Sequence, residues 1–193
     1  MSQRSFQSNN EFAIASNEPQ RLADFTRELG GVIYEDPRER WEHLPFRALA
    51  SVTCDTREDL DAIADVGLYV VCRRAIKAGA APWVGLFPMR HRSDRSHAQC
   101  DAHWRDKHGP LALEQHRFMS SYHQLSVVAT LSGPTVDGFA LCGFDSEADL
   151  RERFYSEPGG ERIIAADVGQ FADPRRSPRR LIAQARYWYD NSA

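Results

Sequence analysis

A weak internal repeat limits what this chain can fold into more than any other feature of its sequence. The segment CDTREDLDAI, which begins at Cys54, is similar to FDSEADLRERF, which begins at Phe144. Both segments combine acidic and hydroxyl residues typical of a helix start with an apolar position that can face inward. Such repetition indicates that the chain contains one supersecondary unit twice.

The predicted order of elements is also similar in the two halves. In the first half, apolar runs and helical spacing predict strands over 12–15, 46–54 and 68–75, a helix over 21–29, and a helix that begins at Asp55 or Thr56 and extends to Val66. In the second half they predict strands over 83–89, 122–131 and 139–144, a helix over 96–108, and a final helix and strand. This order fits two ferredoxin-like βαββαβ units.

A four-stranded sheet with both helices on one face has a second apolar face that must be covered. Two such units can cover each other when their sheets curve together. We therefore predict an α+β fold in which two fused ferredoxin-like βαββαβ repeats form an α+β barrel, with residues 1–80 as a divergent N-terminal repeat and residues 81–193 as the C-terminal repeat. The interior between the sheets is the predicted small-molecule cavity.

The composition argues against several classes of partner. The formal net charge of −3 gives no reason to expect a nucleic-acid partner, because nucleic-acid binders usually carry a basic surface. No segment is apolar enough for a signal peptide or a membrane span. The GxGxxG and P-loop patterns of nucleotide sites are missing from the sequence. We therefore expect a cytoplasmic protein that uses no cofactor and binds neither nucleic acid nor membrane.

Histidine is concentrated in one part of the chain, because six of the seven lie between residues 91 and 123. Imidazole titrates near neutrality, so a histidine that faces an apolar pocket can take up a proton and return it without a cofactor. His108 is the first candidate for this catalytic role and His103 is the second. Tyr122 is the candidate donor of a hydrogen bond to a carbonyl or enolate oxygen.

Four further residues are predicted to contribute to substrate binding: His91, Trp104, Arg73 and His123. His91 follows the first strand of the second half and can orient substrate at the rim of a cavity. Arg73 and Arg74 interrupt an apolar strand, so one of them should face the barrel interior or its mouth. That arginine can hold an acidic substrate or pair with a neighbouring acid.

Structural roles are open for the same residues. His108 can cap the last carbonyls of its helix, where a positive charge is favourable. His103 and Trp104 can serve as core packing, and Tyr122 as an aromatic residue at a strand edge. His116, which is predicted to lie in a loop, is expected to be exposed.

A metal site is not predicted. His103 and His108 are five residues apart, which places them about 140° out of phase on a regular α-helix. They should therefore have distinct roles and should not share an ion. The sequence also contains no HExxH motif and no paired CxxC.

The sequence indicates the start, the buried face and the end of the helix predicted over residues 96–108. Ser96 can cap it, and Gln99 can complete a capping box. This register places Trp104 and Lys107 together on one face by 3.6-residue periodicity. The dipeptide at 109–110, Gly-Pro, should break the last turn.

The run SHAQCDAHWRDKHGPLA resembles the pattern of the EthD family, over a stretch from about Trp83 to Trp188. The positions that match are Ser96, His103, Trp104, His108, Pro110 and Leu111, together with Tyr122 and Gln124 in the strand that follows. The resemblance implies a ferredoxin-like, dimeric α+β barrel, and it leaves a homodimer open. Proteins with this barrel include cyclases, dehydratases, lactone isomerases and some haem enzymes, so the resemblance implies the fold more strongly than a reaction.

We expect a cofactor-independent lyase, dehydratase or isomerase that uses histidine acid/base chemistry on a hydrophobic aromatic or polyketide-like carbonyl compound. One alternative is a non-catalytic protein that binds a small molecule or assists a partner oxidase. A further alternative is a haem or metal enzyme, because a single axial histidine suffices to hold a haem.

Overall fold

The computed structural model describes residues 10–54 and 58–188. The first half contains β1 (Asn10–Ser16), α1 (Pro19–Leu29), β2 (Gly31–Glu35), β3 (Ala48–Cys54), α2 (Glu58–Asp61) and β4 (Gly67–Lys77). The second half contains β5 (Trp83–Met89), α3 (His97–His103), the π-helical turn η1 (Trp104–His108), α4 (Gly109–Gln115), β6 (Ser121–Ser132), β7 (Gly138–Phe144), α5 (Glu147–Glu152), α6 (Gly160–Phe171) and β8 (Leu181–Trp188).

The strands form a closed barrel in the order β1-β3-β2-β8-β5-β7-β6-β4. Each half supplies four neighbouring strands, β4-β1-β3-β2 and β8-β5-β7-β6, and every pair of neighbours is antiparallel. The halves join through β2 with β8 and through β4 with β6, so the two sheets leave no open edge. The predicted α+β barrel of two ferredoxin-like repeats is confirmed.

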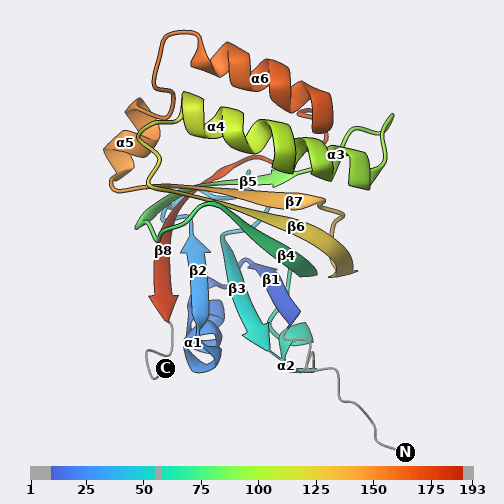
Figure 1. Ribbon diagram of the computed structural model, residues 1–193. Helices are drawn as coiled ribbons and strands as arrows, with labels where there is room; N and C mark the ends of the chain where they lie inside the picture. The colour runs from blue at the N-terminus through green and yellow to red at the C-terminus, as the bar shows by residue number, and fades with distance from the viewer. Residues whose placement is uncertain (1–9, 55–57, 189–193) are drawn as a thin grey trace, which may run out of the picture.

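The helices cover the outer face of the barrel (Figure 1). α3, α4 and α6 lie over the sheet of the second half, whereas α1 lies beside β2 and β3 at the opposite end of the molecule. Apolar clusters fill the space between each half's strands and its helices. Within the described ranges, no helix has the length and apolarity needed to cross a membrane.

The middle of the barrel is packed with side chains. Phe139 on β7 is fully buried there, and its ring contacts those of Phe46 and Tyr69 at centroid distances of 6.3 and 5.3 Å. The interior cavity that we predicted is therefore confined to one mouth of the barrel, where a space of about 470 Å³ opens beside Arg73 and His123.

The helix predicted between Asp55 and Val66 is much shorter than expected. Its predicted start lies outside the described residues, and α2 ends at Asp61. The backbone N–H groups of Ile63 and Ala64 both donate to the carbonyl of Leu60, which closes a turn. The N–H of Val66 then donates to Ala15 at the end of β1. Pairing with β1 thus directs this segment into β4 and ends the helix early.

Candidate active site

The long helical segment of the second half begins as the sequence predicts. The Ser96 side chain accepts a hydrogen bond from the backbone N–H of Gln99, and the Gln99 side chain accepts one from the N–H of Ser96. This reciprocal capping box satisfies two backbone donors at the start of α3.

The predicted break at Gly109 and Pro110 is wrong, because the helical path continues through η1 into α4. The N–H of Gly109 donates to the carbonyl of Trp104, five residues earlier, as in a π-helix. Pro110 lies in the first turn of α4, where a missing N–H costs little. The inserted π turn buries His108 and leaves Lys107 exposed, so His108 takes the place next to Trp104 on the buried face that a period of 3.6 assigned to Lys107.

The π turn also brings His103 and His108 to one carboxylate. Nε2 of His103 lies 2.8 Å from Oδ1 of Asp167 on α6, and Nδ1 of His108 lies 2.8 Å from Oδ2 of the same residue. The angular separation that we calculated for a regular helix therefore does not apply. Because a carboxylate only accepts hydrogen bonds, each bonded ring nitrogen carries a proton.

His108 is a buried imidazole with a defined orientation. Burial lowers its pKa below the usual value, and this effect exceeds the opposing influence of Asp167. The ring is therefore neutral at pH 7. With the proton on Nδ1 directed at Asp167, the lone pair is on Nε2.

A cavity of about 350 Å³ lies next to His108, between the outer face of the second-half sheet and the helices. Its walls are mainly apolar. Aromatic and aliphatic wall residues include Phe87, Phe154, Ile164, Val168 and Phe171. Polar wall residues are His108, His116, Tyr122, Tyr155, Glu161 and Ser177. A predominantly apolar pocket with a few polar groups is typical of small-molecule sites.

Tyr122 and Trp104 both line this cavity. The Tyr122 hydroxyl accepts hydrogen bonds from Trp104 Nε1 at 3.1 Å and from Gln124 Nε2 at 3.2 Å. Burial raises the pKa of Tyr122, so its phenol stays protonated. Gly138 on β7 admits the Trp104 ring, since a Cβ there would lie only 2.6 Å from Cζ3. Trp104 is thus a packing residue and a wall of the cavity.

Two other predicted substrate-binding residues lie at the mouth of the barrel, on its inner side. Arg73 donates to Glu11 Oε1 at 2.8 Å and to Ser51 Oγ at 2.9 Å, so an acid of the chain already pairs with it. Nε2 of His123 contacts the carbonyl of Gly79 at 2.9 Å. Neither residue lines the cavity beside His108.

The remaining predicted residues lie near the cavity without lining it. The His103 ring stacks on Phe171 with 5.4 Å between centroids and holds the second oxygen of Asp167. His91 lies just after β5 and contacts Asp137. The structure therefore divides the seven predicted site residues among several places and brings His108, Tyr122 and Trp104 together at one cavity.

Our sequence interpretation missed two residues of this site. Asp167 was missed because an acid in an amphipathic helix has no feature that links it to histidines about sixty positions away. His116 was expected to be exposed, which is wrong: only 4% of its surface is accessible. Nδ1 of His116 contacts the carbonyl of Phe154 at 2.6 Å, and this contact turns the ring inward.

We expect the free energy of unfolding to fall as the pH drops below about 6.5, the pKa of a free imidazole. Burial lowers the pKa of His116 and of His108, so the unfolded chain takes up their protons first. Each proton adds a slope of up to about 1.4 kcal/mol per pH unit. Urea unfolding between pH 7.5 and 5.5 should show a shallower slope for His116→Gln. An unchanged slope would contradict this origin.

Comparison with known proteins supports the resemblance noted in the sequence. Residues 92–175 match the family model described as the EthD domain, a stretch that includes η1, α4 and Asp167. A search of curated proteins found no match.

Two solved structures align with this chain over most of its length. An anthrone oxidase-like protein aligns over 97% of both chains with 8% identity and a TM-score of 0.58. A candidate monooxygenase from Lactobacillus acidophilus NCFM aligns over 93% of this chain and 96% of its own, with 8% identity and a TM-score of 0.48. At this identity the first similarity shows a common fold.

Proposed function

We propose, from the match of residues 92–175 to the EthD domain model and from the cavity beside His108, that this protein removes a proton from a hydrophobic carbonyl compound bound there. The observation that carries the proposal is the hydrogen bond from His108 Nδ1 to Asp167, 2.8 Å long, at the wall of an apolar cavity. A neutral imidazole held in this way is suited to act as a general base.

The pair formed by His108 and Asp167 can both take a proton from the substrate and return it. Nε2 of His108 accepts the proton from substrate, and the carboxylate of Asp167 stabilises the imidazolium that results. The imidazolium can then return the proton to another atom of the substrate. His103 acts as a positioning residue, since it binds the other oxygen of Asp167 and lies outside the cavity.

Tyr122 is the candidate partner for the substrate oxygen. Its hydroxyl oxygen already accepts from Trp104 and Gln124, so its own hydrogen is the group that it can offer to a ligand. A donor at this place would stabilise the negative charge that develops on a carbonyl oxygen when the adjacent carbon loses a proton.

The walls indicate the class of substrate. Phe87 and Phe154 present rings with 5.7 Å between their centroids, and Phe171 lies near His108. Such a surface fits a flat, aromatic or polyketide-like compound better than a charged metabolite. Lyases, dehydratases and isomerases that act on such compounds can each use removal of a proton next to the carbonyl as a step.

A second candidate is an anthrone as the substrate, whose oxidation after proton removal would require dioxygen as the external oxidant. Its support is the structural neighbour described as an anthrone oxidase-like protein, whose fold this chain has. Removal of a proton from an anthrone would be the same first step at the same base. The alternative of a purely binding protein has less support, because His108 reaches the cavity wall.

Deuterium exchange tests the proposed step without knowledge of the product. Aromatic and polyketide-like ketones, with anthrone included, would be incubated with the protein in D2O, and exchange of the acidic C–H would be followed by NMR. We expect His108→Gln to slow the exchange by about 10²- to 10⁴-fold.

The matched control is His43→Gln, which changes an exposed histidine in the first half and should leave the exchange rate unchanged. Exchange at the wild-type rate in His108→Gln would remove His108 as the base. Saturable binding of a ketone without any exchange would instead favour the binding-protein alternative.

A further inference from the structure

We propose that His91, His97 and Asp137 bind a divalent transition-metal ion. The three side chains come from the segment just after β5, the first turn of α3 and the segment just before β7. One ligand atom from each lies within 4.8 Å of the other two. The site is distinct from the base at His108 and does not depend on the proposed proton transfer.

The distances between the ligand atoms suit a metal. Nδ1 of His91 lies 2.8 Å from Oδ1 of Asp137, and Nδ1 of His97 lies 3.1 Å from the same oxygen. Metal bonds of about 2.1 Å at right angles place neighbouring ligand atoms about 3.0 Å apart. The two nitrogen-to-oxygen distances are therefore close to those between neighbouring ligand atoms on one ion.

The contact between His91 and Asp137 is poorly explained as an ordinary hydrogen bond. Although Nδ1 of His91 is only 2.8 Å from the carboxylate, it is buried and has no aligned hydrogen-bond partner. Leaving a buried polar nitrogen without a partner costs about 1–3 kcal/mol. A metal ion would satisfy this nitrogen, because its lone pair would point at the ion.

The other carboxylate oxygen of Asp137 contacts two groups of the segment just after β5. Oδ2 accepts a hydrogen bond from the backbone N–H of His91 at 2.9 Å and lies 3.3 Å from Nε of Arg90. These contacts turn Oδ1 toward the two imidazoles, as outer partners of metal-binding carboxylates commonly do.

The backbone around the cluster is well anchored. His91 forms a bridge with Ala172, and the N–H of Asp137 donates to Met89. The capping box of Ser96 and Gln99 holds the first turn of α3, which carries His97. Each ligand residue thus lies in or directly beside a regular element and is held by backbone hydrogen bonds, which lowers the entropic cost of binding an ion.

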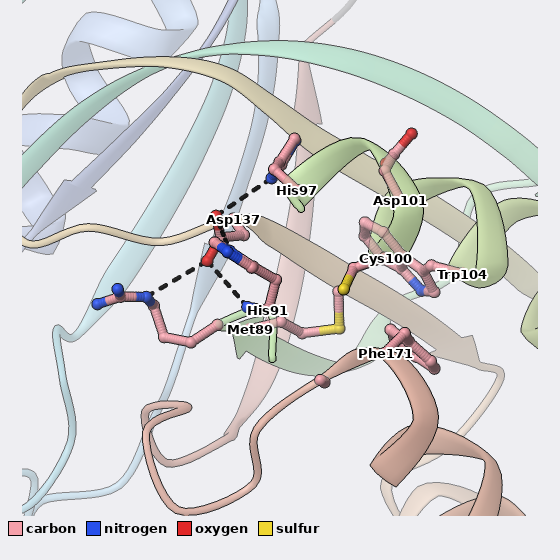
Figure 2. A pocket seen from close by; sticks show the side chains of 10 residues that line it. Met89, His91, His97, Cys100, Asp101, Trp104, Asp137 and Phe171 are labelled. Atoms are coloured by element: carbon pink, nitrogen blue, oxygen red, sulfur yellow. Dashed lines mark hydrogen bonds and ion pairs between the residues drawn. The ribbon is translucent and has the colours of Figure 1, made fainter. Parts of the chain in front are cut away.

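Figure 2 shows the three side chains beside a small space that Met89, Cys100, Trp104 and Phe171 also line. Its volume of about 10 Å³ is close to that needed for a single water molecule or ion. Trp104 and Phe171 also line the cavity beside His108, so the two sites are adjacent.

The ligand set indicates the class of metal. Imidazole nitrogen favours zinc, cobalt, nickel, copper and iron, whereas calcium and magnesium prefer ligand sets of oxygen atoms alone. Two histidines with one carboxylate also leave coordination positions for water or another small ligand. We therefore expect Zn²⁺ and Co²⁺ to bind, and Mg²⁺ to compete poorly.

Titration of the metal-free, purified full chain with Co²⁺ tests the site through the visible absorption of the bound ion. Competition with Zn²⁺ then gives the affinity of the site for Zn²⁺. We expect one equivalent to bind. His97→Ala and Asp137→Asn should each weaken binding at least about 100-fold, because each removes a direct ligand.

The matched control is His43→Ala, which removes an exposed histidine far from the cluster in sequence and should bind one equivalent as the wild type does. Circular dichroism of each variant would establish that the fold is intact. Failure of the wild type to bind, or wild-type affinity in both folded ligand variants, would overturn the proposal. The deuterium-exchange assay is independent of this titration, so the two proposals can fail separately.

Discussion

Replacement of Asp167 by Asn is expected to slow substrate proton exchange by about 10²- to 10⁴-fold. The Asn amide can donate to Nδ1 of His108, which would move the ring proton to Nε2 and remove the basic lone pair from the cavity. Asn also lacks the charge that stabilises the imidazolium. Both effects act through His108, so Asp167 is a positioning residue although it supplies the nearest charge.

The pH profile separates this role from a structural one. Asp167 raises the pKa of His108, so its removal should move the acidic limb of the rate profile to lower pH. His103→Gln is the matched variant, since it removes the other histidine on Asp167 and leaves the bond to His108 in place. We expect this variant to keep most of the activity. Equal losses in both variants, or an Asp167→Asn rate close to wild type, would contradict the assignment of roles.

The second large effect is expected in the barrel interior, where Phe139→Ala should lower the free energy of unfolding by about 3–5 kcal/mol. Phe139 is fully buried and belongs to the second half, whereas its ring partners Phe46 and Tyr69 belong to the first. The cavity left by the missing ring would therefore weaken contacts between the halves. We expect the chain to unfold in a single transition, with its midpoint shifted to lower urea.

Urea unfolding followed by both tryptophan fluorescence and circular dichroism checks this expectation. Val128→Ala on β6 is the matched control, because 69% of Val128 is exposed and its truncation should change the stability by less than about 0.5 kcal/mol. Two separate transitions in the wild type, or a loss below 1 kcal/mol in Phe139→Ala, would show that the halves do not depend on this contact.

Much of the fold could be predicted because its signals are local. Hydrophobic periodicity and the repeat around Cys54 and Phe144 predicted the element order, and the need to cover two apolar sheet faces predicted the barrel. The capping box at Ser96 was equally readable, since donor and acceptor lie three residues apart in sequence. The length of α2 could not be predicted, because a hydrogen bond to distant β1 ends the helix.

The candidate site shows the limit of local signals. The sequence by itself determined the α+β barrel and the start of α3, and it predicted seven site residues, of which the structure places His108, Tyr122 and Trp104 at one cavity. Only the tertiary structure decided that a π turn directs His108 inward and that Asp167 on α6 holds it. Helical wheels assume a constant period, and a partner brought from a distant helix has no sequence spacing to reveal it. The packing of α6 against α3, η1 and α4 brings Asp167 to the two histidines, and only the tertiary structure shows this packing.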